Sequence, residues 1–237
     1  MNNIKLFCIP YSGGMAGIYY KWKSSLLPEI KLFPVEAAGH GQRIREDFYE
    51  DVAAAAEDFS DRIFRELQGN EPYAIFGHSL GALLAFETYY ALKRKGVHEP
   101  EHIFFSGRMS PDDLSERTEY YKLPEEEFME VVASYGGNTG EIMQNRELLD
   151  VFVPILRADF RLGETYEYMP HNEKIMCDMT VVNGKDDLSV MICDLERWGQ
   201  HAGKKYDCKC VKGGHFYIIE NVEETVSIIN NILRNKM

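Results

Sequence analysis

The 237-residue sequence is poor in features that would assign it to a simple class. Its five cysteines are too few, and odd in number, for a disulfide scaffold. No apolar run reaches the ~18 residues that a membrane-spanning helix needs, and the first ten residues lack the pattern of a secretory signal. Lysine and arginine total 26 against 38 aspartates and glutamates, and the resulting charge of −12 disfavours broad nucleic-acid binding. We therefore expect a cytoplasmic protein with reduced thiols that binds neither nucleic acid nor membrane.

The sequence does contain short apolar runs that alternate with longer helical patterns. The strand candidates are residues 4–9, 31–35, 73–76, 102–105, 179–182 and 206–211, and the helix candidates between and after them are residues 48–67, 82–95 and 222–233. Such alternation predicts an α/β fold with a mostly parallel central sheet flanked by helices. Because 45% of the residues are apolar and no linker or repeat interrupts the chain, we expect one domain, residues 1–237.

Residues 110–171 interrupt this alternation, because they contain helical segments and no good strand. Pro124 and the three glutamates after it make a favourable start for a helix over residues 123–135. A second helix is expected over residues 146–161, interrupted or kinked at Pro154. This helical insertion fits ordinary crossover helices and a lid over a pocket equally well.

One motif points to chemistry. Residues 77–81 read Gly-His-Ser-Leu-Gly, the pattern G-x-S-x-G, directly between a predicted strand and a predicted helix. The glycines allow a sharp turn that exposes the hydroxyl of Ser79, and the N–H groups that begin the helix favour developing negative charge. The alternative is a strand-to-helix turn with an incidental serine. In this position the motif predicts that Ser79 is a nucleophile.

A serine nucleophile needs a general base, and the base needs an orienting acid. In this arrangement they follow in the order serine, acid, histidine. A turn containing Asp186 and Asp187 follows one predicted strand, and a Gly-Gly pair ending in His215 follows the next. Parallel sheets gather functional loops at the carboxyl ends of their strands. We predict a catalytic triad of Ser79, Asp187 and His215, with Asp186 as the rival acid.

Acyl transfer also needs two N–H donors for the oxyanion of the tetrahedral intermediate. The backbone of Leu80, directly after the nucleophile, is one candidate. The turn after the first strand supplies the other, because its two glycines let N–H groups point inward. We select Ser12 there, with Tyr11 or Gly13 as alternatives.

Two residue pairs have spacings that suggest a metal. Cys208 and Cys210 form a C-x-C pair, but their alternation with polar residues fits a half-buried strand better. His98 and His102 have the spacing of a helical metal pair, which Pro100 between them forbids. We therefore expect no metal site.

Two other histidines lie close to the motifs. His78 stands inside the G-x-S-x-G motif and is expected to pack or to hydrogen-bond locally. His40 stands between two glycines in a loop, where it either lines the pocket or faces solvent.

Together these residues resemble the type II thioesterases, stand-alone editing α/β-hydrolases of polyketide and nonribosomal peptide synthesis. Plain esterases and lipases share the G-x-S-x-G motif but not the block at residues 157–166. The resemblance covers nearly the whole chain, with Ser12 where the family usually has alanine. The motifs that carry it are Pro10-Tyr11-Ser12-Gly13-Gly14 followed by Trp22, Gly77 to Gly81, Ser106-Gly107-Arg108 with Pro111, the lid segments at residues 123–137 and 154–166, and Gly213-Gly214-His215-Phe216.

The resemblance implies an α/β-hydrolase fold with a helical lid over about residues 110–171, and Asp187 in the place of the triad aspartate. It also implies hydrolysis of acyl thioesters on the phosphopantetheine arm of an acyl or peptidyl carrier protein, without a cofactor of its own. A small-molecule carboxylesterase with the same triad and a non-catalytic carrier-binding protein are the alternatives. We expect a monomer.

Docking on such a partner raises a question of charge. Carrier proteins of this type are often acidic, and so is this chain, so long-range attraction does not explain their encounter. A local basic patch near the pocket mouth, with Arg108, Arg117, Lys21 or Lys23, is one hypothesis. The alternative is that these are solvated surface charges.

Overall fold

A computed structural model of the chain describes residues 3–113, 118–137, 140, 143–190 and 195–237. Six parallel strands form its sheet, in the order β2-β1-β3-β4-β5-β6. The strands are β1 (Ile4–Ile9), β2 (Ile30–Pro34), β3 (Tyr73–His78), β4 (His102–Ser106), β5 (Asp178–Gly184) and β6 (Tyr206–Val211). The predicted α/β fold is confirmed, and each predicted strand lies within two residues of an observed one at both ends.

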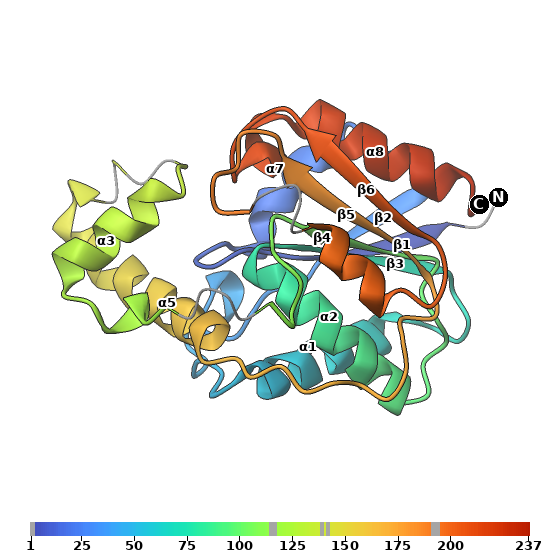
Figure 1. The fold of residues 1–237 in the computed structure, drawn as a ribbon, viewed down its shortest axis with the longest axis horizontal. Helices are drawn as coiled ribbons and strands as arrows, with labels where there is room; N and C mark the ends of the chain where they lie inside the picture. Colours follow the sequence, from blue (N-terminus) through green and yellow to red (C-terminus); the bar gives the residue numbers. More distant parts are fainter. Residues whose placement is uncertain (1–2, 114–117, 138–139, 141–142, 191–194) are drawn as a thin grey trace.

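Helices cover both faces of the sheet (Figure 1). One face carries α1 (Val52–Glu66) and α2 (Leu80–Arg94), and the other carries α8 (Val222–Arg234) together with the short helices η1 (Ala16–Trp22) and α7 (Tyr217–Glu220). Successive strand residues therefore enter different cores: Phe104 packs on the α8 side and Phe105 on the α2 side. Among the described residues, no helix is long and apolar enough to cross a bilayer.

The helix predicted over residues 48–67 begins later than expected. Asp51 is extended, and its carboxylate accepts a hydrogen bond from the N–H of Ala54 at 2.8 Å, so that it caps α1 and the helix starts at Val52. The helix predicted from residue 82 instead begins at Leu80, because the sharp turn of the G-x-S-x-G motif ends directly in its first turn.

The insertion contains η3 (Tyr120–Lys122), α3 (Glu125–Ser134) and α5 (Arg146–Glu164), with no strand among its described residues. α5 runs on through Pro154, where the sequence predicted an interruption or kink. Only its last turns join the rest of the protein, which we call the body: Leu162 enters the core, and Arg161 donates to the carbonyl oxygen of Tyr49 at 2.9 Å. Figure 1 shows α3 and the start of α5 projecting beyond the sheet. These helices hold a separate apolar cluster, made of Phe128, Met129, Val132, Val153 and Leu156.

Candidate active site

The chain turns sharply between β3 and α2, and Ser79 lies at the turn. With φ 54° and ψ −119°, it is the one residue other than glycine with a positive φ among those described. Such a conformation costs ~1–3 kcal/mol and persists only where its surroundings impose it. A Cβ at Gly77 would lie 2.0 Å from the carbonyl oxygen of Gly81, and a Cβ at Gly81 would lie 2.3 Å from that of Ile9. Both positions therefore require glycine, and the crowded turn places Ser79 at the start of α2.

Asp187 and His215, from the loops after β5 and β6, form a hydrogen-bonded pair. Nδ1 of His215 lies 2.8 Å from Oδ2 of Asp187, and both residues are buried. The other carboxylate oxygen accepts from the N–H of Ser189 at 2.9 Å and from its hydroxyl at 2.6 Å. Burial acts to raise the pKa of Asp187, but the hydrogen bonds from His215 and Ser189 outweigh it and hold the pKa below its usual value. The rival, Asp186, has an exposed side chain, so the geometry favours Asp187 as the orienting acid.

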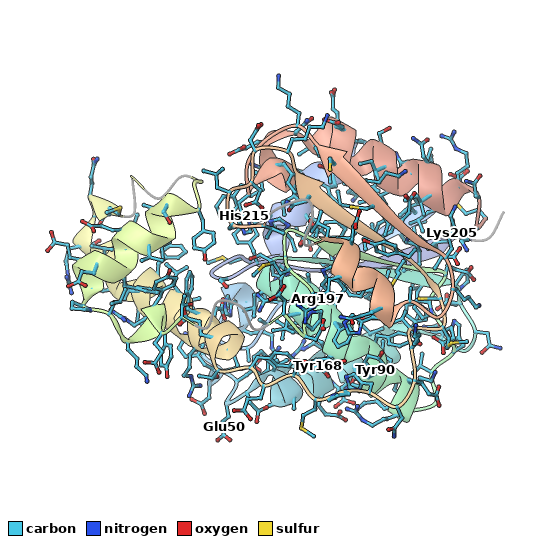
Figure 2. All side chains as sticks on the ribbon, viewed as in Figure 1. Glu50, Tyr90, Tyr168, Arg197, Lys205 and His215 are labelled. Atoms are coloured by element: carbon cyan, nitrogen blue, oxygen red, sulfur yellow. The ribbon has the colours of Figure 1, made fainter. Side chains whose placement is uncertain are left out.

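Ser79 and His215 line one cavity of about 250 Å³. Figure 2 shows His215 at the end of the body that faces the insertion. The cavity is lined from both sides, because loops at the carboxyl ends of the strands supply one wall and the helices of the insertion supply the other. The insertion contributes Val132, Tyr135, Leu156, Asp159, Phe160 and Gly163.

The chain that carries the Ser79 turn, the Asp187–His215 pair and the cavity matches a known family. The family model for the thioesterase domain matches residues 4–233, almost the whole chain. The chain belongs to this family.

Individual relatives narrow the class. Gramicidin S biosynthesis protein GrsT of Aneurinibacillus migulanus is 31% identical over 235 residues, which is 98% of this chain and 89% of that protein. The crystal structure of ClbQ from the colibactin NRPS/PKS pathway has 34% identity and a TM-score of 0.94, covering 99% of this chain and 98% of ClbQ. The type II thioesterase BorB from the borrelidin biosynthetic cluster has 28% identity and a TM-score of 0.87, covering 98% of this chain and 93% of BorB. The protein is a type II editing thioesterase of the class that acts in nonribosomal peptide and polyketide biosynthesis.

The thioesterase also presents the two backbone positions predicted for an oxyanion hole. Ser12 and Leu80 both line the cavity. The alternative donor, Gly13, is occupied, since its N–H donates to Oδ2 of Asp159 at 2.6 Å. The N–H of Gly14 closes the turn on the carbonyl oxygen of Tyr11 at 2.8 Å. These contacts favour Ser12 over Gly13 as the partner of Leu80.

The two nearby histidines have different environments. His78 is fully buried, and its Nδ1 lies 2.7 Å from the hydroxyl of Ser106, which agrees with the local packing predicted for it. Burial and the neighbouring His215 both lower the pKa of His78, so its ring stays neutral. His40 departs from both expectations: it neither faces solvent nor lines the catalytic cavity, but is buried against Asp159. Its loop folds inward because the ring has polar partners there.

The sequence reasoning missed Asp159 and gave Arg108 a different place. Asp159 lies 146 residues along the sequence from Gly13, whose N–H it accepts, and no local pattern signals such a contact. Arg108 was predicted on a docking surface, but its guanidinium lines the cavity, and burial lowers its pKa. Tyr135 and Tyr166 act in the opposite direction on that pKa. Arg108 is the one lysine or arginine among the described residues of the cavity wall.

The residues considered for metal binding have other surroundings and contacts in the structure. Cys208 and Cys210 lie half-buried on β6, and both thiols are free. His98 lies 3.0 Å from the carbonyl oxygen of Glu71, and His102 lies 2.9 Å from the hydroxyl of Thr180. No group of three or more potential metal ligands occurs within the described part of the chain.

Proposed function

We propose that this thioesterase releases acyl groups from the phosphopantetheine arm of an acyl or peptidyl carrier protein, with Ser79 as nucleophile, His215 as base and Asp187 as orienting acid. The observation that carries the proposal is one cavity that joins the strained Ser79 turn to the His215–Asp187 pair. The helical insertion supplies the opposite wall of that cavity, which supports the predicted role of about residues 110–171 as a lid.

The reaction has two halves. In the first half, Nε2 of His215 takes the proton of the Ser79 hydroxyl while the Oγ atom of Ser79 attacks the thioester carbonyl carbon. The backbone N–H groups of Leu80 and Ser12 stabilise the oxyanion. The carbon–sulfur bond then breaks, the carrier thiol takes the proton from the imidazolium, and the acyl group remains on Ser79.

In the second half, His215 takes a proton from water, and the resulting hydroxide attacks the acyl-Ser79 ester. Collapse of the second tetrahedral intermediate returns the proton to Ser79 and releases a carboxylic acid. Asp187 holds Nδ1–H of His215 in both halves, so that Nε2 always faces the reacting atoms. The atoms and protons of both half-reactions are supplied by the chain, the thioester and water.

The size of the cavity favours small acyl groups. At about 250 Å³ it lies near the lower limit of ligand pockets, which are typically ~300–1,000 Å³. The end of the pantetheine arm must share this space with the acyl group. We therefore propose that groups of a few carbons are hydrolysed faster than long acyl chains.

The test uses carrier proteins loaded with acetyl, propionyl or dodecanoyl phosphopantetheine, with loss of the acyl group followed by intact-protein mass spectrometry. We expect hydrolysis of the short thioesters and slow release of dodecanoyl. Faster turnover of a simple oxygen ester with the same acyl group would favour a carboxylesterase instead. Failure of a fluorophosphonate to label Ser79 would favour a non-catalytic carrier-binding protein.

The setting of the enzyme belongs to the same proposal. We place it in the cytoplasm as a monomer that meets its carrier proteins there, without nucleic acid or membrane as a partner. Size-exclusion chromatography with light scattering, at a formula mass of 27.3 kDa, tests the monomer. A stable dimer mass would contradict it.

A further inference from the structure

Asp159 joins three segments that are far apart in the sequence. It lies on α5 of the insertion and is buried. One of its oxygens, Oδ2, accepts the N–H of Gly13 at 2.6 Å and lies 2.9 Å from Nε2 of His40. Gly13 belongs to the turn after β1 that carries the proposed oxyanion donor, and His40 to the loop after β2. A single carboxylate therefore ties the insertion to the turn beside Ser79.

The hydrogen bonds of His40 define its protonation. Its Nδ1 lies 3.0 Å from the carbonyl oxygen of Ala38, which can only accept, so Nδ1 carries a proton. Nε2 faces a carboxylate oxygen of Asp159, so it carries a proton as well. Burial acts to lower the pKa of His40, but the hydrogen bond and charge of Asp159 outweigh it and raise that pKa above its usual value. These contacts favour an imidazolium–carboxylate pair.

The surroundings of the ring reinforce this charge. The largest influences of charged groups on its pKa come from Asp159 on α5 and Glu36 after β2, and both are acidic. A carboxylate oxygen of Glu36 accepts the N–H of Ala16 at 2.8 Å, which keeps it close by. The ring of Phe48 meets His40 edge-on, with the centroids 6.4 Å apart.

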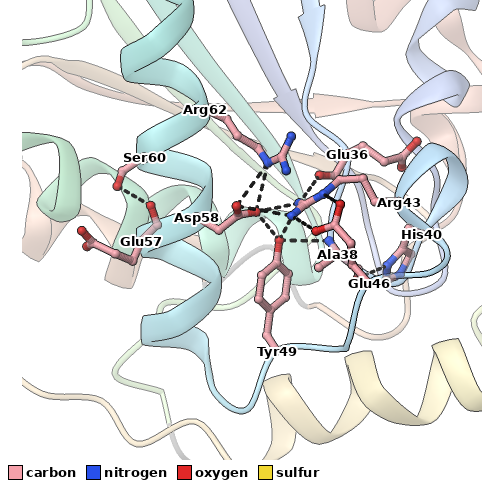
Figure 3. Close-up of polar contacts among 10 residues, drawn as sticks. All are labelled: Glu36, Ala38, His40, Arg43, Glu46, Tyr49, Glu57, Asp58, Ser60 and Arg62. Carbon is pink, nitrogen blue, oxygen red and sulfur yellow. Dashed lines mark hydrogen bonds and ion pairs between the residues drawn. The ribbon is translucent and has the colours of Figure 1, made fainter.

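The loop of His40 is fixed to the body, as Figure 3 shows. Arg43, just beyond His40, donates to the carbonyl oxygen of Glu36 at 3.0 Å and to Oδ2 of Asp58 on α1 at 2.6 Å. Tyr49 donates to the same carboxylate of Asp58 at 2.6 Å. His40 is therefore held at a fixed place on the body, against which Asp159 docks.

α5 makes a second contact with the same turn. Gly13 has φ 75°, and a Cβ there would lie 2.6 Å from Cδ2 of Leu156. The lack of a side chain lets α5 approach the turn closely, and Asp159 then holds the peptide N–H of Gly13. The adjacent residue, Ser12, lines the cavity and carries the proposed oxyanion N–H. The position of the Ser12 N–H therefore depends on how α5 packs against this turn.

We infer that Asp159 and protonated His40 are positioning residues that couple the seating of the insertion to the completion of the oxyanion hole. With the pair intact, α5 is docked and the turn at Ser12 is fixed. When the pair is broken, α5 and the turn lose their shared contact, and the oxyanion is stabilised less well. This inference rests on the proposed function, because it assumes reaction at Ser79.

The pair gives the enzyme a pH dependence of known sign. Because Asp159 raises the pKa of His40, the charged pair is complete at pH values below that pKa and is lost as the pH rises through it. We therefore expect kcat for carrier thioesters to fall on the alkaline side while KM changes little. A merely structural contact would change the thermal unfolding temperature without producing this limb of the pH profile.

The experiment measures kcat and KM against pH for the wild type, His40→Gln, Asp159→Asn and Asp159→Ala. A misplaced donor should lower kcat about 10–100-fold near neutral pH, most in Asp159→Ala and less in Asp159→Asn, which keeps an acceptor for Gly13. His40→Gln should lack the alkaline limb. The matched control is His98→Gln, whose ring nitrogen Nε2 lies 3.0 Å from the carbonyl oxygen of Glu71, outside the cavity wall, and which should keep the wild-type profile.

A second measurement needs no substrate. NMR of protein with ¹³C-labelled histidine follows the ring of His40, which should titrate at lower pH in Asp159→Asn than in the wild type. A His40 titration unchanged in Asp159→Asn, or an alkaline limb unchanged in His40→Gln, would overturn the inference. Failure of the wild type to hydrolyse any carrier thioester would instead count against the proposed function, while the NMR titration would still report on the pair.

Discussion

The body and the insertion line the same cavity but are built on opposite principles. In the body, backbone geometry positions Ser79: glycines on both sides are packed against carbonyl oxygens, and no side chain fits there. In the insertion, side chains form the wall, and α3 and α5 pack on a small cluster of their own. A rigid turn suits chemistry, which needs fixed donors, whereas a helical wall can change its side chains without disturbing the sheet. We propose that the body carries the reacting groups, and that the insertion selects the acyl groups that reach them while Asp159 holds the turn at Ser12 in place.

The largest expected effect tests the body side of this comparison. Ser79→Ala removes the nucleophile and should lower kcat about 10⁶-fold, as loss of a triad serine does in other hydrolases. The fold should persist, because replacing serine with alanine at this position removes no contact of the core. The measurement is release of acetyl from a loaded carrier protein, with circular dichroism as the control for folding. A variant that retained most of its activity would show that the turn does not carry the nucleophile.

The acid of the triad gives the next largest effect. Asp187→Asn keeps the size of the side chain but no longer fixes the His215 ring with Nδ1–H toward it, so kcat should fall about 10⁴-fold. The matched control is its neighbour: Asp186→Asn changes an exposed side chain and should leave kcat within about 2-fold. Equal losses in both variants would mean that the turn as a whole, and not the pair with His215, matters.

The two regions also differ in how far the sequence predicted them. Short apolar runs located the inner strands, because strands buried on both faces are apolar throughout, whereas β6 was located from its alternation of apolar and polar residues. Ser79, Asp187 and His215 could be proposed because each follows the end of a strand, where parallel sheets gather their loops. Continuous patterns along the chain thus predicted the fold and the proposed triad.

What the sequence did not predict depends on contacts between distant segments. Asp159 and Gly13 are 146 residues apart, and neither stands in a local motif that links them. The burial of His40 follows from that same contact. The late start of α1 was missed for another reason: Phe48 fits the helical spacing, but the carboxylate of Asp51 accepts the N–H of Ala54, so that the helix begins at Val52.

A pair of core substitutions compares the stability of the two regions. Phe104 and Phe128 are both fully buried, the first in the body and the second in the insertion. Phe104→Ala should cost ~3–5 kcal/mol of global unfolding free energy. Phe128→Ala loses similar contacts, including Phe160 at a centroid distance of 5.2 Å, but the loss should loosen α3 and α5 locally.

Thermal unfolding and amide hydrogen exchange distinguish these outcomes. We expect Phe104→Ala to lower the Tm strongly, and Phe128→Ala to lower it less while accelerating exchange in the insertion. In the acyl-release assay, Phe128→Ala should relax the preference for short groups. An equal fall in Tm for the two variants would show that body and insertion unfold as one cooperative unit.

The smallest expected effect concerns docking on the body side. Lys21 and Lys23 are exposed at η1, whereas Arg108 of the predicted basic patch lies in the cavity wall and Arg117 is outside the described residues. If the two lysines meet an acidic carrier, Lys21→Glu and Lys23→Glu should each raise KM about 2–5-fold, since exposed charge pairs contribute only ~0.2–1 kcal/mol. The effect should shrink as salt screens the charges.

The control for docking is Lys204→Glu, which makes the same charge change at an exposed position just before β6 begins. Because the net charge of the protein changes equally in all three variants, a similar rise in KM for Lys204→Glu would reflect general repulsion of the acidic carrier. A rise confined to Lys21 and Lys23 would place the carrier beside η1. The phosphopantetheine arm would then enter the cavity from the body side, and the insertion would face the acyl group. This arrangement agrees with the roles proposed above for the body and the insertion.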